Sequence, residues 1–373
     1  MTQNTQIVSK TRLMYSAMVF VLCYLVMILC AFCMIVLNEP SGWTQYFVNY
    51  YQRFLSMCVC ILLLCLVTYY YYYFEDREFL ANANGAIMIF TSFIVSLLIN
   101  YVIGRFISVY ARPIAIYPLV MLFLLNRRQS IMLNFVFSLL LYTIDTYSNN
   151  SVITGLRSEI YYYLLLQVVL GCIAVFMASK VRTRIGLLLV GGLLSVPTAA
   201  TVLILEMPQG VFNSWVDVMI AISYRIMGIV SSSVFALALL PLYEVVFNRL
   251  TVFRLRELTG ANAPLLKRLR AEAPGTFNHC LIVAQLAETC AIAIGENAEL
   301  ARAAAYYHDV GKLKQPECFT ENQTGYNVHD EITPELSADI ISSHTRDGYD
   351  IRRKRTCRTR LPMLRLSTTA PFP

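Results

Sequence analysis

The sequence predicts an all-α protein: a multi-pass bundle of transmembrane helices followed by an all-helical cytoplasmic domain. Hydrophobic residues make up 57% of the 373 residues and charged residues 14%, with a mean hydropathy of +0.57. Soluble domains carry about 25% charged residues. Apolar runs of about 20 residues recur up to Phe247, and the composition then changes to that of a soluble domain. A protein that is soluble throughout is excluded.

Eight apolar segments are predicted to cross the membrane. Six are long and uninterrupted: 13–37, 54–74, 86–103, 160–178, 185–205 and 216–247. The other two, 107–125 and 131–147, are shorter and are separated by a polar turn. This pattern predicts a tight hairpin of two spans, with a re-entrant pair as the alternative.

The basic residues of the loops predict the orientation of these spans. With the N-terminus inside, eleven Lys or Arg residues lie in cytoplasmic segments and four in external loops. Short cytoplasmic loops carry the excess of Lys and Arg in membrane proteins. We therefore expect a cell-membrane protein with both termini in the cytoplasm, and the same bias favours two crossings between residues 107 and 147.

The chain is expected to divide into five parts. They are a cytoplasmic tip with a membrane anchor (1–38), a short external loop (39–53), a seven-transmembrane region (54–248), a cytoplasmic domain (252–350) and a basic tail (351–373). The tail holds seven Lys or Arg and no acid, which equals the net charge of +7. Because this charge comes from one short segment, it gives no support for DNA or RNA as a partner. Membrane lipid is the expected partner, and the tail is expected to be a solvated or headgroup-associated coil.

The cytoplasmic domain contains all four histidines of the chain. Its apolar periodicity predicts helices over 264–271, 276–295 and 298–308. His279, His308, His329 and His344 lie within 66 residues, and His308 directly precedes Asp309. A single His-Asp pair is more often a structural feature at a helix end. Together with His279 and His344, however, it offers three imidazoles and one carboxylate, a set that suits Fe, Mn or Zn.

Several motifs of this domain resemble those of a known family. They are Glu272-Ala273-Pro274-Gly275-Thr276-Phe277-Asn278-His279, Ala305-Tyr306-Tyr307-His308-Asp309-Val310-Gly311-Lys312, Glu321-Asn322-Gln323 and Ser342-Ser343-His344-Thr345-Arg346-Asp347-Gly348. They closely resemble the bacterial seven-transmembrane HD-domain cyclic-di-AMP phosphodiesterases. The resemblance covers about residues 252–350 at motif level, and the seven spans from residue 54 match the family's membrane region in number and order. It implies that residues 252–350 form part of an HD domain.

The resemblance also implies roles for individual residues. His279, His308, Asp309 and His344 would be metal ligands, and Asp309 would be the bridging carboxylate of a two-metal centre that holds Mn or Fe. Lys312 would be a further catalytic residue that meets a phosphate oxygen, with a solvated lysine as the alternative. Asn322, His329 and Asp330 are weaker candidates for substrate contact, and a loop-capping role fits His329 and Asp330 equally well.

The implied activity is hydrolysis of cyclic-di-AMP to pApA by a membrane-bound, metal-dependent phosphodiesterase. A second copy of the chain, in a homodimer, is a further candidate partner. The sequence departs from the family in having no large external domain after the first span, and in lacking the family's later His-His-Gly motif and Asp. A truncated and impaired enzyme is therefore expected. The alternatives are a catalytically inactive membrane protein that binds a nucleotide or serves as a signalling scaffold, and an unrelated multi-pass protein.

Overall fold

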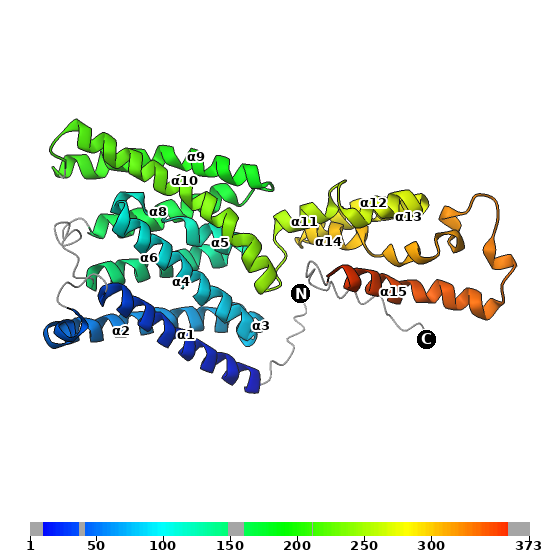
Figure 1. Cartoon of the computed structure of the whole chain (residues 1–373), viewed down its shortest axis with the longest axis horizontal. Helices are drawn as coiled ribbons and strands as arrows, with labels where there is room; N and C mark the ends of the chain where they lie inside the picture. The colour runs from blue at the N-terminus through cyan, green and yellow to red at the C-terminus, as the bar shows by residue number, and fades with distance from the viewer. Residues whose placement is uncertain (1–9, 37–41, 148–159, 211, 357–373) are drawn as a thin grey trace. The chain divides into compact units, whose positions relative to one another are not determined.

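The computed structural model describes residues 10–36, 42–147, 160–210 and 212–356. Helices are the only regular secondary structure in these ranges, as the sequence predicted. The chain divides into two compact units, Met1–Tyr243 and Glu244–Pro373 (Figure 1).

The first unit is a bundle of apolar helices. Its helices are α1 (Lys10–Val36), α2 (Gly42–Glu75), the short α3 (Arg77–Ala81), α4 (Ala83–Phe106), α5 (Ile116–Leu124), α6 (Arg127–Tyr147), α8 (Ile160–Ala178), α9 (Arg184–Thr201) and α10 (Trp215–Val246). Six helices in the described ranges are long and apolar enough to cross a membrane: Thr11–Val36, Tyr51–Glu75, Ala83–Phe106, Arg127–Tyr147, Arg184–Glu206 and Trp215–Val246. The apolar stretches Val109–Leu124 and Tyr163–Ala178 are shorter.

The segment between α4 and α6 traverses the bundle although its helix is short. At one end Arg112 pairs with Asp145, near the C-terminus of α6. At the other end Arg128 lies 3.9 Å from Glu75, and Gln129 donates to Asp76 beyond the end of α2. The chain therefore passes from the Asp145 side of the bundle to the Glu75 side between residues 112 and 128. Segments 107–125 and 131–147 therefore run antiparallel, as both the hairpin of two spans and the re-entrant pair require.

Burial explains how such a short helix can take this path. The nine residues of α5 span only about 14 Å, against about 30 Å for the hydrocarbon core. Eight of those nine residues are buried, and Tyr117 stacks against both Phe93 of α4 and Phe137 of α6, at centroid distances of 4.5 and 4.7 Å. Irregular backbone at membrane depth is tolerated where surrounding protein shields it from lipid.

Two expected non-helical segments are helical in the structure. Residues 42–53, expected to lie in an external loop, form the first turns of α2. The basic stretch 351–356, expected to be a coil, continues α15 (Pro334–Thr356). Neither stretch contains proline, and Arg and Lys have high helix propensity, so nothing local ends the helix. The rest of the basic tail lies outside the described residues.

The second unit consists of short helices around one apolar core. Its helices are α11 (Val252–Thr259), α12 (Pro264–Glu272), α13 (Pro274–Ala293), α14 (Ala298–Tyr306) and α15. Between α14 and α15 the chain forms the 3-10 turns η4 (Val310–Lys314), η5 (Pro316–Cys318), η6 (Thr320–Asn322) and η7 (Val328–Asp330). The core includes Leu269, Phe277, Ala284 and Val310, from α12, α13 and η4. The three helices predicted in this domain are confirmed as α12, α13 and α14.

Candidate metal centre

A polar cluster lies where α13, the end of α14 and α15 meet. Asn297 caps the N-terminus of α14 by accepting from the N–H of Leu300, and the helix ends at Tyr306. His308 and Asp309 follow directly, so their side chains lie at the junction between α14 and η4. His279 reaches this point from the first turns of α13, and His344 reaches it from the middle of α15.

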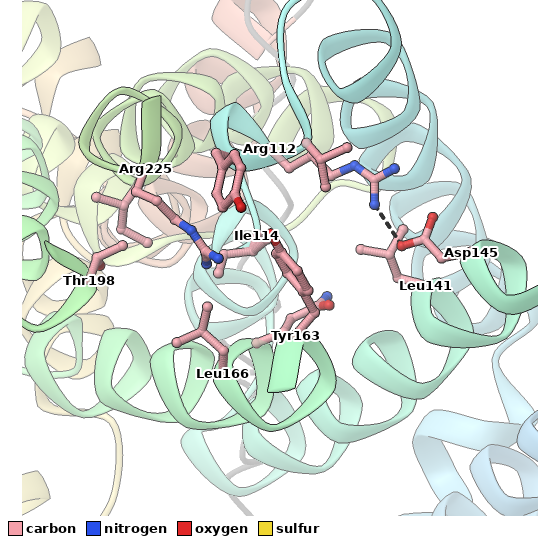
Figure 2. Close-up of a pocket in the computed structure, with 12 residues that line it drawn as sticks. Arg112, Ile114, Leu141, Asp145, Tyr163, Leu166, Thr198 and Arg225 are labelled. Carbon is pink, nitrogen blue, oxygen red and sulfur yellow. Dashed lines mark hydrogen bonds and ion pairs between the residues drawn. The ribbon is translucent and has the colours of Figure 1, made fainter. Parts of the chain in front are cut away.

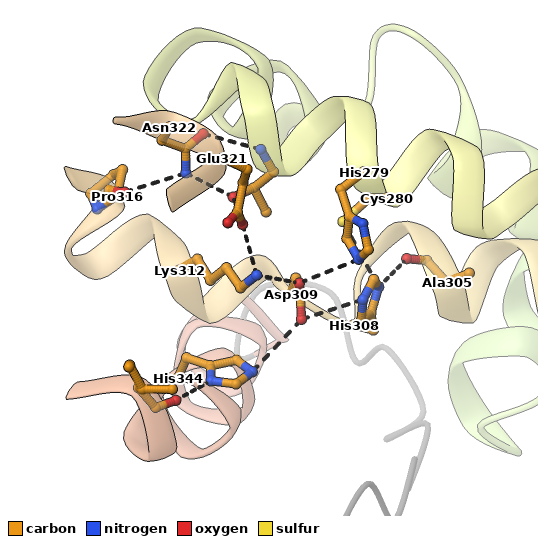
Figure 3. A network of polar contacts seen from close by, with 12 residues as sticks. His279, Cys280, Ala305, His308, Asp309, Lys312, Pro316, Glu321, Asn322 and His344 are labelled. Atoms are coloured by element: carbon orange, nitrogen blue, oxygen red, sulfur yellow. Dashed lines mark hydrogen bonds and ion pairs between the residues drawn. The ribbon is translucent and has the colours of Figure 1, made fainter. Parts of the chain in front are cut away.

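Three imidazoles converge on the carboxylate of Asp309 (Figure 3). The Nε2 atoms of His308 and His344 lie 3.3 and 3.7 Å from Asp309 Oδ1, and His279 Nε2 lies 3.9 Å from Oδ2. Ligand atoms of His279, His308 and Asp309 all lie within 4.8 Å of one another. The structure thus brings together the four residues that the sequence singled out as ligands.

Backbone contacts fix the orientation of two of these rings. His308 Nδ1 lies 2.7 Å from the carbonyl oxygen of Ala305, and His344 Nδ1 contacts the carbonyl oxygen of Ile341. A carbonyl oxygen can only accept, so each Nδ1 carries a proton and donates it, and each Nε2 faces Asp309. A proton fixed on one ring nitrogen in this way is typical of histidines that bind a metal.

A glycine allows α15 to approach the cluster. A Cβ atom at Gly311 would collide with the backbone carbonyl of His344 and would lie 2.5 Å from the backbone nitrogen of Gly348. The backbones of η4 and α15 are therefore in direct contact. This contact brings His344 close to Asp309, from which it is 35 positions away in the sequence.

Lys312 lies between two carboxylates. Its Nζ is 2.8 Å from Asp309 Oδ2 and 2.7 Å from Glu321 Oε1. Burial disfavours the charged lysine, but the hydrogen bonds to Asp309 and Glu321 outweigh this effect and raise the pKa of Lys312. Burial likewise opposes the charge on Glu321, yet the bonds from Lys312, the backbone and Thr276 lower its pKa. Both groups are therefore charged at neutral pH, and Lys312 is not the solvated side chain that was the alternative prediction.

Glu321 joins this network, although the sequence did not identify it as a site residue. Thr276 Oγ1 donates to Glu321 Oε1 at 2.9 Å, so Glu321 links the start of α13 to Lys312. A Cβ atom at Gly275 would collide with the backbone carbonyl of Glu321, which shows how closely η6 packs on α13. The sequence signal was the position of Glu321 beside Asn322 in a recognised motif, but only the fold connects it to Asp309.

Asn322 is bound to the start of α13. Its Oδ1 accepts from the N–H of Thr276 at 3.0 Å, while its Nδ2 donates to Thr276 Oγ1 at 2.8 Å and to the carbonyl of Pro316 at 3.3 Å. These bonds satisfy an N–H in the first turn of α13, which has no partner within the helix. In this structure Asn322 holds η6 against α13.

His329 and Asp330 make contacts within the loop that precedes α15. His329 Nε2 lies 2.6 Å from the carbonyl of Cys318, and Ser337 Oγ lies 2.8 Å from His329 Nδ1. Asp330 accepts a hydrogen bond from Asn327 at 2.9 Å. Both ring nitrogens of His329 are thus engaged away from Asp309, which corresponds to the loop-capping alternative for these residues.

The donor set around Asp309 fits a divalent transition metal. Ligand nitrogens and oxygens at about 2.1 Å from an ion lie about 3 Å or slightly more from one another, close to the separations seen here. Neutral imidazole nitrogens with one carboxylate suit Fe, Mn or Zn. Cys280 is adjacent, and burial raises the pKa of its thiol to about 12, so the thiol is protonated at neutral pH in this metal-free structure.

Comparison with known families supports the division of the chain. A profile of the family described as "7TM receptor with intracellular HD hydrolase" matches residues 51–251, more than half of the chain. The chain belongs to this family. A profile of the HD domain matches residues 276–367, which include all four residues gathered at Asp309. The chain is thus a multi-pass membrane protein with an HD domain after its last span.

Two curated relatives share one name. The cyclic-di-AMP phosphodiesterase PgpH of Listeria monocytogenes is 36% identical over 240 residues, which are 64% of this chain and 32% of that protein. PgpH of Bacillus subtilis is 36% identical over 250 residues, 65% of this chain and 34% of that protein. This chain therefore spans about a third of the length of these relatives.

A solved structure also matches part of the chain. It is described as the HD domain of the Listeria monocytogenes phosphodiesterase PgpH in complex with cyclic-di-AMP. It is 50% identical and covers 26% of this chain and 45% of that chain, with a TM-score of 0.25.

Proposed function

We propose that this protein is a membrane-bound, metal-dependent phosphodiesterase that hydrolyses cyclic-di-AMP to pApA. The convergence of His279, His308 and His344 on Asp309 carries this proposal. Membership of a family of HD hydrolases supports a phosphohydrolase, and the names of the two curated relatives support a cyclic dinucleotide as the substrate.

In the proposed site His279, His308, Asp309 and His344 hold Mn or Fe. Such an ion neutralises charge on the phosphodiester and lowers the pKa of a water ligand toward neutrality. The two oxygens of Asp309 face different imidazoles, Oδ1 toward His308 and His344 and Oδ2 toward His279, which supports the bridging role. His308 and His344 would bind the ion through Nε2, because the Nδ1 of each ring donates to a backbone carbonyl.

Lys312 has two roles in this proposal. It balances the charge of Asp309 and Glu321, and an ammonium group has a third N–H that can meet a phosphate oxygen. Its position within hydrogen-bonding distance of Asp309 supports this catalytic role. In this proposal Asn322, His329 and Asp330 position the loops that contact the substrate. They do not contact the bond that is cleaved.

The proposed orientation places the HD domain in the cytoplasm, together with both termini. The excess of Lys and Arg in the loops on the N-terminal side supports this orientation. An HD domain described as intracellular in the matching family agrees with it.

The direct test uses the full chain in lipid nanodiscs, stripped of metal and reloaded with Mn²⁺ or, without oxygen, Fe²⁺. Chromatography of the nucleotides should show cyclic-di-AMP converted to pApA. Asp309→Asn should lower turnover by about 100-fold or more, since it weakens a ligand to the ion. Asp339→Asn is the matched control, because Asp339 is an exposed acid on the same helix as His344. Equal loss in both variants would contradict the assignment.

Binding of the nucleotide without hydrolysis is the second candidate function. The observation in its favour is that two carboxylates already hold Lys312 at 2.7 and 2.8 Å, which limits its use by a phosphate. Equilibrium binding of cyclic-di-AMP to the metal-loaded chain, measured beside turnover, separates the two functions. Binding with no pApA would select the second.

A further inference from the structure

A pocket lined by both charged and apolar side chains lies within the first unit, at the Asp145 side of the bundle (Figure 2). Its walls come from the turn η1 (Val109–Ala111) and the residues after it, and from α6, α8, α9 and α10. Two arginines in its lining, Arg112 and Arg225, lie among helices that otherwise carry few charges. Ionisable groups are expensive at membrane depth and mark functional sites there.

Arg225 is the central group of this pocket. Its side chain is 5% exposed, and Figure 2 shows its guanidinium directed into the pocket beside Tyr163. Its Cζ lies 4.8 Å from the ring centroid of Tyr163 and 5.1 Å from that of Tyr110, so two aromatic rings flank the planar cation. Arg112 is turned the other way and pairs with Asp145 at 2.6 Å.

Hydrogen-bond donors at this site lack acceptors. Arg225 Nη2 pairs with Glu206 Oε1, but Arg225 Nε has no hydrogen-bond partner among the described residues. The Nε2 atom of Gln167, a residue that is 5% exposed, also has none among them. A buried donor without an acceptor destabilises the fold, so a ligand that supplies acceptors there gains affinity. The group that best complements two such donors carries acceptors alone, as an ionised carboxylate does.

The irregular segment that carries Glu206 provides a way to admit such a group. Glu206 ends a π-helical turn (Val202–Glu206) that follows α9, and a 3-10 turn and Gly210, at a φ of +70°, come next. Single π-helical turns are frequent at functional sites. Glu206 is a carboxylate already bound to Arg225, and the short segment that bears it is not held in a regular helix. A second carboxylate can therefore replace it without changing the charge balance at Arg225.

We propose that this pocket binds the carboxylate group of a small ligand, which takes the place of Glu206 on Arg225. The cavity of about 30 Å³ has room for about two waters, so the ligand's carboxylate also needs the space that the Glu206 carboxylate leaves. A tetrahedral phosphate does not match a space shaped by a planar, singly charged carboxylate. Arg225 lies 21 residues before the end of α10, about 32 Å along the helix that leads to the HD domain. In the orientation proposed above, the pocket belongs to the external half of the membrane region.

The test is titration calorimetry on the full chain in phosphatidylcholine nanodiscs, with acetate and succinate as probes and inorganic phosphate and methylamine as comparisons. The carboxylates should bind and the other two should not. Arg225→Gln should weaken carboxylate binding about tenfold or more, because it removes a charge-assisted hydrogen bond. Arg105→Gln, an exposed arginine at the end of α4, is the control and should bind like the wild type.

Two further variants keep the test decisive if Arg225→Gln does not fold. Glu206→Gln should strengthen carboxylate binding severalfold, since the internal competitor loses its charge, and Gln167→Leu should weaken it. Nanodiscs that contain phosphatidylglycerol should give the same affinities. Absence of carboxylate binding, equal binding of phosphate, weaker binding in Glu206→Gln, or displacement by the anionic lipid would each overturn the proposal. None of these readouts depends on phosphodiesterase activity.

Discussion

Lys312 and Glu321 form a charged pair next to the proposed metal ligands, and this pair has a testable effect on stability. Glu321→Gln should lower the free energy of unfolding by about 1 kcal/mol at pH 7, because Lys312 and Thr276 each lose a charged acceptor. Glu317→Gln, an exposed glutamate in the preceding turn, should have little effect. Thermal or denaturant unfolding of the full chain, compared with the wild type, measures both.

The pH dependence of that difference follows from the lowered pKa of Glu321. A carboxyl group whose pKa is lower in the folded state stabilises the fold above its ordinary pKa of about 4.3. This contribution is lost as the pH falls through the folded-state pKa. The gap between the wild type and Glu321→Gln should therefore be full near neutrality and shrink below about pH 4.3. A gap that stays constant down to pH 3 would contradict the assigned ion pair.

Two histidines of the HD domain should respond differently to substitution. His344→Ala should weaken Mn²⁺ binding about tenfold or more, since His344 Nε2 faces Asp309. His329→Ala should leave Mn²⁺ affinity unchanged but lower the free energy of unfolding by about 1 to 3 kcal/mol. The carbonyl of Cys318 and the hydroxyl of Ser337 would each lose a hydrogen bond to the imidazole. Metal titration and unfolding of both variants test this contrast. Equal loss of Mn²⁺ affinity would place His329 in the metal site.

At the scale of elements, the contact between η4 and α15 decides whether His344 reaches Asp309. Gly311→Ala should force α15 away, because the new Cβ would collide with the carbonyl of His344. We expect Mn²⁺ affinity to fall about tenfold or more, although no ligand is changed, since ligand geometry tolerates only a few tenths of an ångström. Metal titration of the full chain measures the effect.

Gly260→Ala serves as the control for this substitution. A Cβ there would meet the carbonyl oxygens of Arg256 and Glu257 at 3.3 and 3.5 Å. Both residues belong to α11, which carries none of the proposed metal ligands. Its Mn²⁺ affinity should match that of the wild type. An undiminished affinity in Gly311→Ala would show that α15 can shift without moving His344, and the proposed role of the glycine would fail.

At the scale of the whole molecule, the membrane orientation can be tested by labelling cysteines from outside the cell. In intact cells, a membrane-impermeant maleimide should label Asn213→Cys, which lies in the exposed connection before α10, and should not label Lys180→Cys before α9. The wild-type chain gives the background from its native cysteines. The opposite pattern would reverse the orientation and place the HD domain outside.

Much of the molecule could be predicted from local sequence. The apolar runs predicted the helices of the membrane region, because about 20 apolar residues in a row have few stable states other than a membrane span. The gathering of all four histidines in one segment, with Asp309 beside His308, predicted a metal centre in a helical domain. Errors occurred at segment ends, as in residues 42–53 and 351–356, where helix continues without an apolar signal.

The contacts that give these elements their chemistry depended on tertiary structure. Packing of η4 against α15 brings His344 to Asp309, and packing of η6 against α13 connects Glu321 to Lys312. The segment that contains the short α5 can lie within the bundle because helices such as α4 and α6 pack against it. Sequence determined which segments are helical and apolar, since those properties depend on neighbouring residues. Tertiary structure decided which side chains meet, since those contacts join residues far apart in the chain.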